Sequence, residues 1–466
     1  MADYFLGIDL GSTTSKAIII NDRDEVVGKG ITNTRANYEV AAEIAKVQAL
    51  YNARFHLLKQ ALAAEIAADP AFARYATDLD AAFQFVQFES RLERLRRELA
   101  ETALKVETRV PATELVKHVQ EIADGILATG RRRYMEEDLG GKGQFFRDIV
   151  GEAYAKAVEE RPKELFEPLM LLFDKSITPV ENEMMAPDFS ELVHQAQAML
   201  ERYHAEKAAP DEAAALRRAA GAFTAAIDRV AAEELNIARM VGTGYGRALL
   251  PFPEDCIRSE ILCHAFGAHA VFPKTRTVLD IGGQDTKAIQ VDSHGLVTSF
   301  HMNDRCAAGC GRYLGYIADE LNISLNELGP MAMKAEKEVT ICSTCTVFAG
   351  AELRELLNVG ERREDILAGL HKAIVMRALS LLARSGGVKN EFTFTGGVAR
   401  NDAVLHYVSD MVRRNYGQDL TINVHTDSIF MGALGGAMFA RRNIKADLPA
   451  AAKGAKAGAE ENEGMA

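Results

Sequence analysis

The sequence predicts an α/β protein with two domains of similar design and a large all-helical insertion. A ten-residue pattern, Asp-(Leu/Ile)-Gly-x4-Lys-Ala-Ile, begins at Asp9 and again, without gaps, at Asp280. A repeat of this specificity indicates two domains built alike. Residues 39–207 lie between the two copies and have hardly any strand signal, but carry Ala, Glu, Leu, Arg and Lys at helical spacing.

The composition is that of an ordinary globular protein. The chain has 466 residues, 48% of them hydrophobic and 26% charged, which is long enough for more than one domain. A net charge of -12 and a pI near 5.5 argue against a broad nucleic-acid surface. No apolar stretch approaches the roughly 20 residues that span a bilayer, and no export signal is visible. We therefore expect a cytoplasmic protein that binds neither nucleic acid nor membrane.

The first copy of the pattern predicts a β-hairpin. Apolar runs at residues 5–10 and 16–20 flank a turn of small and hydroxylated residues. Glycine in such a turn allows close backbone approach, so that successive N–H groups can converge on phosphate oxygens. Asp9 can hold a hydrated Mg²⁺, and Lys16 can supply a charge to the β- and γ-phosphates. The candidate phosphate-binding residues are Gly11, Ser12, Thr13, Thr14 and Lys16.

The second copy predicts a matching hairpin, with Asp280 as a second candidate Mg²⁺ ligand and Gly282 and Gly283 in the turn. Lys287 occupies the repeated lysine position, which alone does not show that it reaches a nucleotide. A water that attacks a γ-phosphate needs positioning more than covalent help. Either Gln284 or Asp285 is placed to orient it. The catalytic candidates are Asp9, Asp280, Gln284 and Asp285. Two ordinary hairpins with capping aspartates are the alternative.

A third glycine element follows the alternating strand at residues 392–395. Its Gly-Gly turn before a helix can bring backbone against a flat base. The candidate base-binding residues are Gly396, Gly397, Val398 and Asn401.

In this order, the two hairpins and the Gly-Gly-x3-Asn segment resemble the adenosine motif of the acetate and sugar kinase, Hsp70 and actin superfamily. Residues 432–437, in the predicted last helix, resemble its second connecting segment. The resemblance implies two ribonuclease-H-like (actin-like ATPase) domains with ATP and Mg²⁺ in the cleft between them.

The domain boundaries follow from these assignments. The stretch from Asp211 has apolar residues on one face and is expected to be the helix that leads into the next strand of the first domain. The last residues are poor in apolar side chains and are expected to be disordered. The expected segments are the first half of domain I (1–38), the helical insertion (39–207), the rest of domain I (208–275), domain II (276–445) and a tail (446–466).

Four cysteines fall within 40 residues, in two pairs that each open a helical pattern: Cys306, Cys310, Cys342 and Cys345. Disulfide frameworks belong to small secreted domains, so a metal or iron–sulfur site is favoured. Helix N-termini favour thiolates and an anionic cluster, whereas four thiolates also suit structural zinc. The spacing leaves open both the metal and whether two or four cysteines bind it.

The hairpins and the cysteine segments at residues 304–309 and 345–349 together resemble the ATPases that activate benzoyl-CoA reductases and 2-hydroxyacyl-CoA dehydratases. The resemblance covers residues 4–34 and about 236–440 and not the insertion. In that family, two subunits share one [4Fe-4S] cluster, to which each gives two cysteines, and ATP hydrolysis drives a low-potential electron onward. The resemblance implies Cys306 and Cys345 as ligands, ahead of Cys310 and Cys342.

Two departures from the simpler activators, Cys310 and the segment 350–352, combine with the insertion to resemble the longer ATPase subunit of ATP-dependent benzoyl-CoA reductase. That subunit couples ATP hydrolysis to electron transfer from ferredoxin for the reductive dearomatisation of benzoyl-CoA in anaerobic aromatic degradation. The resemblance implies as partners a shorter homologous ATPase subunit, two ring-reducing benzoyl-CoA-binding subunits and ferredoxin.

Three alternatives stay open. One is a homodimeric activator of a 2-hydroxyacyl-CoA dehydratase, within the same family. The second is a sugar or acid kinase of the same fold with a structural zinc site. The third is an Hsp70-like or filament-forming ATPase, in which the cysteine pairs would have no purpose. The insertion either braces the heterodimer, docks the ring-reducing subunits or is a passive elaboration.

Overall fold

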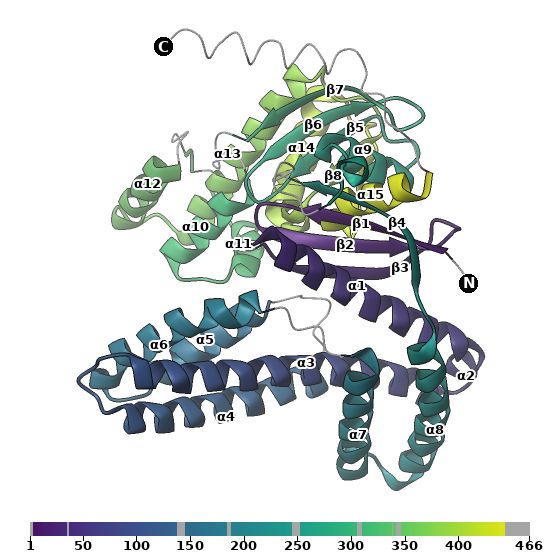
Figure 1. Cartoon of the computed structure of the whole chain (residues 1–466). Helices are drawn as coiled ribbons and strands as arrows, with labels where there is room; N and C mark the ends of the chain where they lie inside the picture. Colours follow the sequence, from purple (N-terminus) through teal and green to yellow (C-terminus); the bar gives the residue numbers. More distant parts are fainter. Residues whose placement is uncertain are drawn as a thin grey trace. The chain divides into compact units, whose positions relative to one another are not determined.

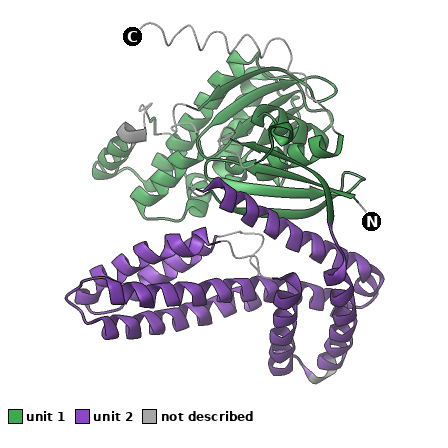
Figure 2. Ribbon diagram, in the orientation of Figure 1, with its two compact units in different colours: residues 1–34, 236–466 green, residues 35–235 purple. Residues whose placement is uncertain are grey.

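The computed structural model describes residues 3–34, 37–137, 145–183, 188–244, 252–304, 310–337, 339–341 and 346–442. The chain divides into two compact units (Figure 2). Unit 1 takes residues 1–34 and 236–466, and unit 2 takes residues 35–235. The chain therefore leaves unit 1 once and returns to it, as expected for an insertion.

The first sheet of unit 1 has the strand order β3-β2-β1-β4 (Figure 1). Its strands are β1 (Asp3–Leu10), β2 (Thr14–Ile20), β3 (Val26–Asn33) and β4 (Asn236–Gly244). β1 and β2 form the predicted antiparallel hairpin, in which Asp9 pairs with Lys16. β4 joins β1 in parallel, so a strand from beyond the insertion completes the sheet.

The second sheet has the order β7-β6-β5-β8-β9. Its strands are β5 (Thr277–Ile281), β6 (Thr286–Val291), β7 (Val297–Asn303), β8 (Phe392–Thr395) and β9 (Ile422–Val424). Asp280 pairs with Lys287 across β5 and β6, as Asp9 pairs with Lys16 across the first hairpin. Each hairpin also has a parallel neighbour, β4 on β1 and β8 on β5. The repeat in the sequence is thus a repeat of strand topology.

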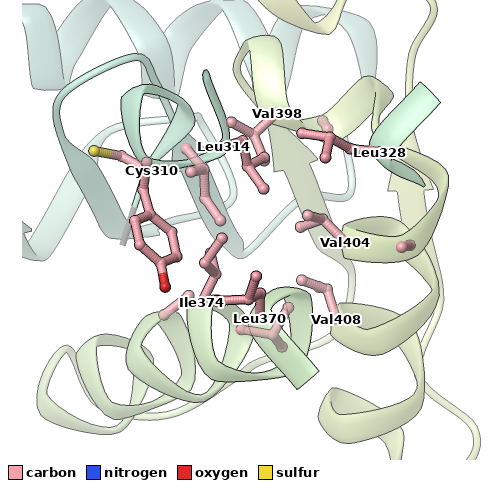
Figure 3. Close-up of a cluster of buried hydrophobic side chains, with 14 of the residues drawn as sticks. Cys310, Leu314, Leu328, Leu370, Ile374, Val398, Val404 and Val408 are labelled. Atoms are coloured by element: carbon pink, nitrogen blue, oxygen red, sulfur yellow. The ribbon is translucent and has the colours of Figure 1, made fainter. Parts of the chain in front are cut away.

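The helices of unit 1 surround these sheets. They are α9 (Glu260–Val271), α10 (Gly311–Leu321), α11 (Leu325–Ala332), α12 (Thr346–Asn358), α13 (Arg363–Arg384), α14 (Asp402–Tyr416) and α15 (Met431–Arg442), with short 3-10 turns at Glu254–Cys256, Gly397–Arg400 and Ser428–Phe430. Helices α10, α11, α13 and α14 share one apolar core with β5 and β8 (Figure 3). By length and composition α13 could cross a membrane, contrary to the expectation from the sequence, but its residues Leu370 and Ile374 are buried in this core.

Helix α15 packs unusually close to β1 and α9 because glycines line both sides of the contact. A Cβ added at Gly435 would overlap the carbonyl of Cys263 on α9. A Cβ at Gly7 would overlap backbone of α15, and one at Gly267 would overlap the carbonyl of Met431. The Gly-Ala-Leu-Gly-Gly-Ala segment therefore serves as a backbone-to-backbone contact that fixes where α9 lies relative to the first sheet.

Unit 2 is all helical over its described residues, as expected. Its helices are α1 (Tyr38–Ala61), α2 (Ala63–Ala68), α3 (Pro70–Lys105), α4 (Ala112–Glu136), α5 (Phe146–Glu159), α6 (Lys163–Asn182), α7 (Phe189–Lys207) and α8 (Pro210–Ala232). One apolar core joins α1, α3, α7 and α8, and a second joins α3 to α4, α5 and α6. The 36-residue α3, about 54 Å long at 1.5 Å per residue, belongs to both cores.

The boundaries of the insertion differ from those expected. Residues 208–235 were assigned to the first ATPase domain, but they fall within unit 2. The apolar face of α8, with Leu216, Phe223 and Ile227, is buried against α1, α3 and α7. Periodicity shows that a helix has an apolar face and not which partner covers it. The expected tail at residues 446–466 lies outside the described residues.

We predict that Gly435→Ala lowers the free energy of unfolding of unit 1 by roughly 1–3 kcal/mol, because the new methyl group has no room against the backbone of α9. Gly315→Ala on α10 is the matched control, since nothing lies within 4 Å of a Cβ there. It should raise stability by about 0.5–1 kcal/mol. Urea unfolding of both variants tests this, and equal effects would contradict the close contact.

Candidate nucleotide-binding and catalytic site

A cavity of about 610 Å³ opens in unit 1 between the two hairpin turns, α10, α11 and the segment at residues 396–402. This volume is within the range of small-molecule sites, about 300–1,000 Å³. The predicted site residues that line it are Asp9, Gly11, Ser12, Thr13, Thr14, Lys16, Asp280, Gly282, Gly283, Asp285, Gly396, Gly397, Val398 and Asn401. Gln284, the remaining candidate in the hairpins, is partly exposed and is not among the described residues that line the cavity.

The two hairpin turns touch each other at the cavity. Gly283 of the second turn lies against Thr13 of the first, so closely that any Cβ at Gly283 would overlap the threonine side chain. Within the second turn, the Gly282 N–H donates to the Asp285 carbonyl at 2.9 Å. The first turn is held from outside, because the hydroxyl of Thr34, directly after β3, donates to the Gly11 carbonyl at 2.5 Å. These contacts hold both turns in one arrangement around the cavity.

Asp9 is a buried carboxylate that accepts no hydrogen bond from the described part of the chain. Its side chain is 1% exposed, and Oδ2 lies 2.9 Å from Lys16 Nζ. That pair is close but not in hydrogen-bonding geometry, and neither oxygen of Asp9 has a hydrogen-bond partner among the described residues. Lys16 instead donates to the Thr14 carbonyl at 3.1 Å. Buried carboxylate oxygens need a partner, so Asp9 has spare capacity to receive a hydrated cation.

Asp280, the equivalent of Asp9, is more fully satisfied. Its Oδ1 accepts a hydrogen bond from the Thr395 hydroxyl at 2.8 Å and lies 3.1 Å from His264 Nδ1. Burial alone would raise the pKa of Asp280, but the charges of His264 and Lys287 hold it well below its usual range. Asp280 is therefore ionised and suited to a cation in the cavity.

Lys287 is held by three carboxylates. Its ammonium nitrogen lies 2.8 Å from Asp285, 2.9 Å from Glu260 and 3.4 Å from Asp280. Burial would lower the pKa of Lys287, but these carboxylates raise it well above its usual value. The second lysine of the repeat thus neutralises buried carboxylates.

Sequence reasoning missed Glu260 and His264, which lie one turn apart on α9 and line the cavity. The imidazole sits between the two hairpins, with Nε2 3.8 Å from Asp9 Oδ2 and Nδ1 3.1 Å from Asp280 Oδ1. Burial lowers the pKa of His264, but the carboxylates of Asp280 and Asp9 outweigh it and raise the pKa. Burial also raises the pKa of Glu260. A Glu–His pair at this spacing is common on helices and gave no usable signal.

The donor set fits Mg²⁺. Four carboxylates face two lysines and His264; they belong to Asp9, Glu260, Asp280 and Asp285. When all four carboxylates are ionised, the group carries excess negative charge even if the imidazole is protonated. Carboxylates combined with water and phosphate oxygens are the ligands that Mg²⁺ prefers. Asp9, whose oxygens accept no hydrogen bond from the described residues, and the ionised Asp280 are the residues best placed to hold it.

The third predicted segment forms one side of the cavity. Gly396 has a φ of +89°, and a Cβ there would overlap the backbone of Ile281 in β5, so only glycine fits. Asn401 caps α14, accepting the Val404 N–H at 3.0 Å, and its Nδ2 lies 3.2 Å from Nε2 of His371. His371 is fully buried on α13, and burial lowers its pKa to about 4.

Of the four clustered cysteines, Cys306, Cys342 and Cys345 lie outside the described residues. Cys310 is the N-cap of α10 and is buried, and Figure 3 shows it beside Leu314 with its sulfur directed away from the other labelled side chains. Helix α12 begins at Thr346, directly after Cys345, so helices follow both cysteine pairs as predicted.

Helix α10 is bonded directly to the second hairpin. Its first N–H groups, of Gly311 and Arg312, donate to the carbonyls of Gly282 and Gly283 at 2.9 and 2.7 Å. These carbonyls belong to a turn that lines the cavity. A movement of that turn would therefore be transmitted to the helix that follows the first cysteine pair.

The sequence model of the BadF/BadG/BcrA/BcrD ATPase family matches residues 6–440. The chain belongs to this family. It is accordingly an ATP-hydrolysing enzyme, and the expectation of an ATPase is confirmed by the family.

Relatives of known function support the assignment. The activating ATPase of (R)-2-hydroxyglutaryl-CoA dehydratase from Acidaminococcus fermentans is 41% identical over 207 residues, 44% of this chain and 76% of the relative. One of the subunits of benzoyl-CoA reductase from Thauera aromatica is 31% identical over 176 residues, 38% of this chain and 62% of the relative.

The solved structure of component A of the A. fermentans dehydratase superimposes with a TM-score of 0.51 at 23% identity, covering 95% of this chain and 98% of that one. This likeness shows the fold. The predicted α/β, actin-like ATPase fold is confirmed.

The buried His371 predicts a dependence of stability on pH. The pKa of His371 is about 4 in the folded protein, compared with an ordinary value of 6.5. Between these pH values the histidine is protonated in the unfolded chain and neutral in the folded chain. The contribution of the neutral His371 to the free energy of unfolding is therefore fully present above pH 6.5. It is lost as the pH falls to about 4, which lowers the free energy of unfolding by about 3 kcal/mol at most.

His371→Gln should not show this loss. Urea unfolding of both proteins at several pH values isolates the effect, because all other titrating groups are shared. Parallel stability curves would contradict the prediction.

Proposed function

We propose that this chain is an ATP-hydrolysing, electron-activating subunit that passes a low-potential electron to a partner enzyme acting on an acyl-CoA. The observation that carries the proposal is the hydrogen-bonded connection between the cavity and α10. The turn at Gly282 and Gly283 belongs to the proposed phosphate site and also binds the helix that follows the first cysteine pair. One element is thus positioned to couple nucleotide state to the cysteine region.

Within the cavity, each side chain has a distinct part in ATP hydrolysis. Lys16 and the turns of both hairpins line the cavity, where the Lys16 ammonium and the turn N–H groups would bind the phosphates. Asp9 and Asp280 would hold Mg²⁺, which when bound would supply positive charge to stabilise the transferred phosphoryl group. Asp285, and not Gln284, is the candidate for orienting the attacking water, since only Asp285 lines the cavity among these two.

Coupling requires a ligand that discriminates between two conformations. ATP and ADP differ by the γ-phosphate, which the two touching turns would contact together. Loss of that phosphate would remove a ligand shared by the two turns and would weaken the contact between Gly283 and Thr13. Because the same turn is bonded to α10, its displacement would move the start of that helix.

The electron carrier we propose is a [4Fe-4S] cluster shared with a partner ATPase subunit, with Cys306 and Cys345 as the ligands of this chain. The resemblance of the sequence around these cysteines supports this, and a ferredoxin is the proposed donor. Cys310 is the less suitable ligand because its side chain is buried in the apolar core. We place the protein in the cytoplasm with its partners.

Sequence similarity favours a 2-hydroxyacyl-CoA dehydratase as the electron acceptor, because identity to the dehydratase activator is 41% against 31% to the reductase subunit. Benzoyl-CoA reductase, expected from the sequence, is the second candidate. The helical unit at residues 35–235 favours it, since this insertion suggested the longer reductase subunit. In that case the partners are a shorter ATPase subunit and two ring-reducing subunits.

We predict that Asp9→Asn lowers the rate of Mg²⁺-dependent ATP hydrolysis by about 100-fold or more, because a neutral amide neither holds the cation nor balances Lys16. Asp22→Asn, at an exposed position beyond β2, is the matched control and should keep the rate. Steady-state phosphate release measures both. A normal rate in Asp9→Asn would remove this cavity as the site of hydrolysis.

We predict about four irons per two homologous chains after anaerobic purification, in keeping with a shared [4Fe-4S] cluster. Cys306→Ala and Cys345→Ala should each lose the iron and its visible absorbance, whereas Cys342→Ala should keep both. Metal analysis that finds about one zinc per chain and no iron would instead establish a structural zinc site.

A further inference from the structure

We propose that His371, which does not touch the cavity, is a positioning residue that fixes the side-chain amide of Asn401 and with it one side of the nucleotide site. The proposal rests on the proposed function in one respect, that the cavity binds ATP. It assigns a role to a buried histidine that the sequence did not single out.

The proton on His371 can be placed from its contacts. Nδ1 lies 2.6 Å from the carbonyl oxygen of Leu367, one turn earlier on α13. A carbonyl oxygen only accepts, so Nδ1 must carry the hydrogen. The ring is fully buried among apolar residues of the core, and burial lowers its pKa to about 4, so it is neutral at physiological pH. Nε2 therefore has no hydrogen and is an acceptor.

This acceptor decides which way Asn401 faces. The side-chain atom 3.2 Å from Nε2 has to be a donor, which identifies it as the amide nitrogen Nδ2. Oδ1 then points to α14, where it accepts the Val404 N–H at 3.0 Å. Rotating the amide by half a turn would set acceptor against acceptor at His371 and donor against donor at Val404. The unprotonated Nε2 of His371 and the Val404 N–H thus favour the same single orientation of the cap.

Asn401 in this orientation joins three helices beside the cavity. It caps α14, bonds to α13 through His371, and lies against Gly329 of α11, where a Cβ would come within 3.0 Å of Oδ1. Its own N–H donates to the Val398 carbonyl at 3.0 Å, which closes the 3-10 turn Gly397–Arg400. That turn and Gly329 both line the cavity.

Apolar packing alone does not set this orientation. Figure 3 shows Val398 and Val404, which flank Asn401 in the sequence, in one cluster with Leu370 and Ile374 of α13. Such contacts fix the spacing of the helices but have no direction. The imidazole–amide hydrogen bond adds the direction, and it does so without exposing a polar group to the apolar core.

The test compares two polar replacements of His371. Glutamine can place an amide oxygen near the position of Nε2 and keep the bond to Asn401. Asparagine is shorter, so it can replace the bond of Nδ1 to Leu367 but leaves Asn401 without an acceptor. We expect His371→Asn to raise the KM for ATP about tenfold and to change kcat less than about twofold, as loss of one buried hydrogen bond implies. His371→Gln should stay within about twofold of the native KM.

His406→Asn replaces an exposed histidine on α14 and is the control. It should leave both the KM for ATP and kcat unchanged. Thermal unfolding without nucleotide shows how far each variant is destabilised. The variants should also be combined with Asn401→Ala. If His371 acts through Asn401, His371→Asn has no further effect on KM in that background.

Equal KM values for His371→Gln and His371→Asn, or an undiminished effect in the Asn401→Ala background, would overturn the proposal. A native chain that fails to bind Mg²⁺-ATP at all would instead overturn the proposed function. Should His371→Asn fail to fold, a native KM for ATP in Asn401→Ala would equally overturn the positioning role.

Discussion

Burial of opposite charges within each of the two hairpins is the constraint on which the rest of unit 1 depends. Desolvated ions are costly unless they are paired in good geometry, and here the pairs are produced by strand register, with Asp9 opposite Lys16 and Asp280 opposite Lys287. The repeat in the sequence thus places a lysine opposite the aspartate in each hairpin. Each hairpin carries its own countercharge, and the two can approach without repelling each other.

Helix α9 completes this charge network and must be placed accurately to do so. Glu260 pairs with Lys287, and His264 reaches toward the aspartates of both hairpins. The glycines shared among β1, α9 and α15 supply that accuracy, since they bring backbones together where side chains would separate them. A region that looks like simple small-residue packing thus positions the charged groups of the cavity.

The cavity has two sides with different mechanical character. On one, Asn401 is tied to α11, α13 and α14 through a defined set of hydrogen bonds and contacts. On the other, the turn of the second hairpin touches the first where Gly283 meets Thr13, and it is hydrogen-bonded to α10. One firmly held side and one side hydrogen-bonded to α10 suit the proposed coupling of ATP hydrolysis to a conformational change.

The sequence identified the residues whose position is fixed by local pattern. Asp9 and Asp280 stood out because a hairpin register is short-range, and Gly396 because a strand followed by Gly-Gly demands a turn. It did not find His264 or His371, because each has a partner on another helix or strand. It also assigned α8 to the wrong unit, because an apolar helix face does not indicate which elements cover it. Gln284 and Asp285 are adjacent in the chain, yet only the folded turn directs one of them into the cavity.

By itself, then, the sequence determined the α/β class, the two matching hairpins and many of the residues that line the cavity, because period, turn chemistry and repetition are local properties. Only the tertiary structure decided which buried groups neutralise the aspartates, which proton orients Asn401 and where the helical unit begins and ends. Those outcomes depend on contacts between residues far apart in the chain, which arise from packing and are not encoded in any single stretch of it.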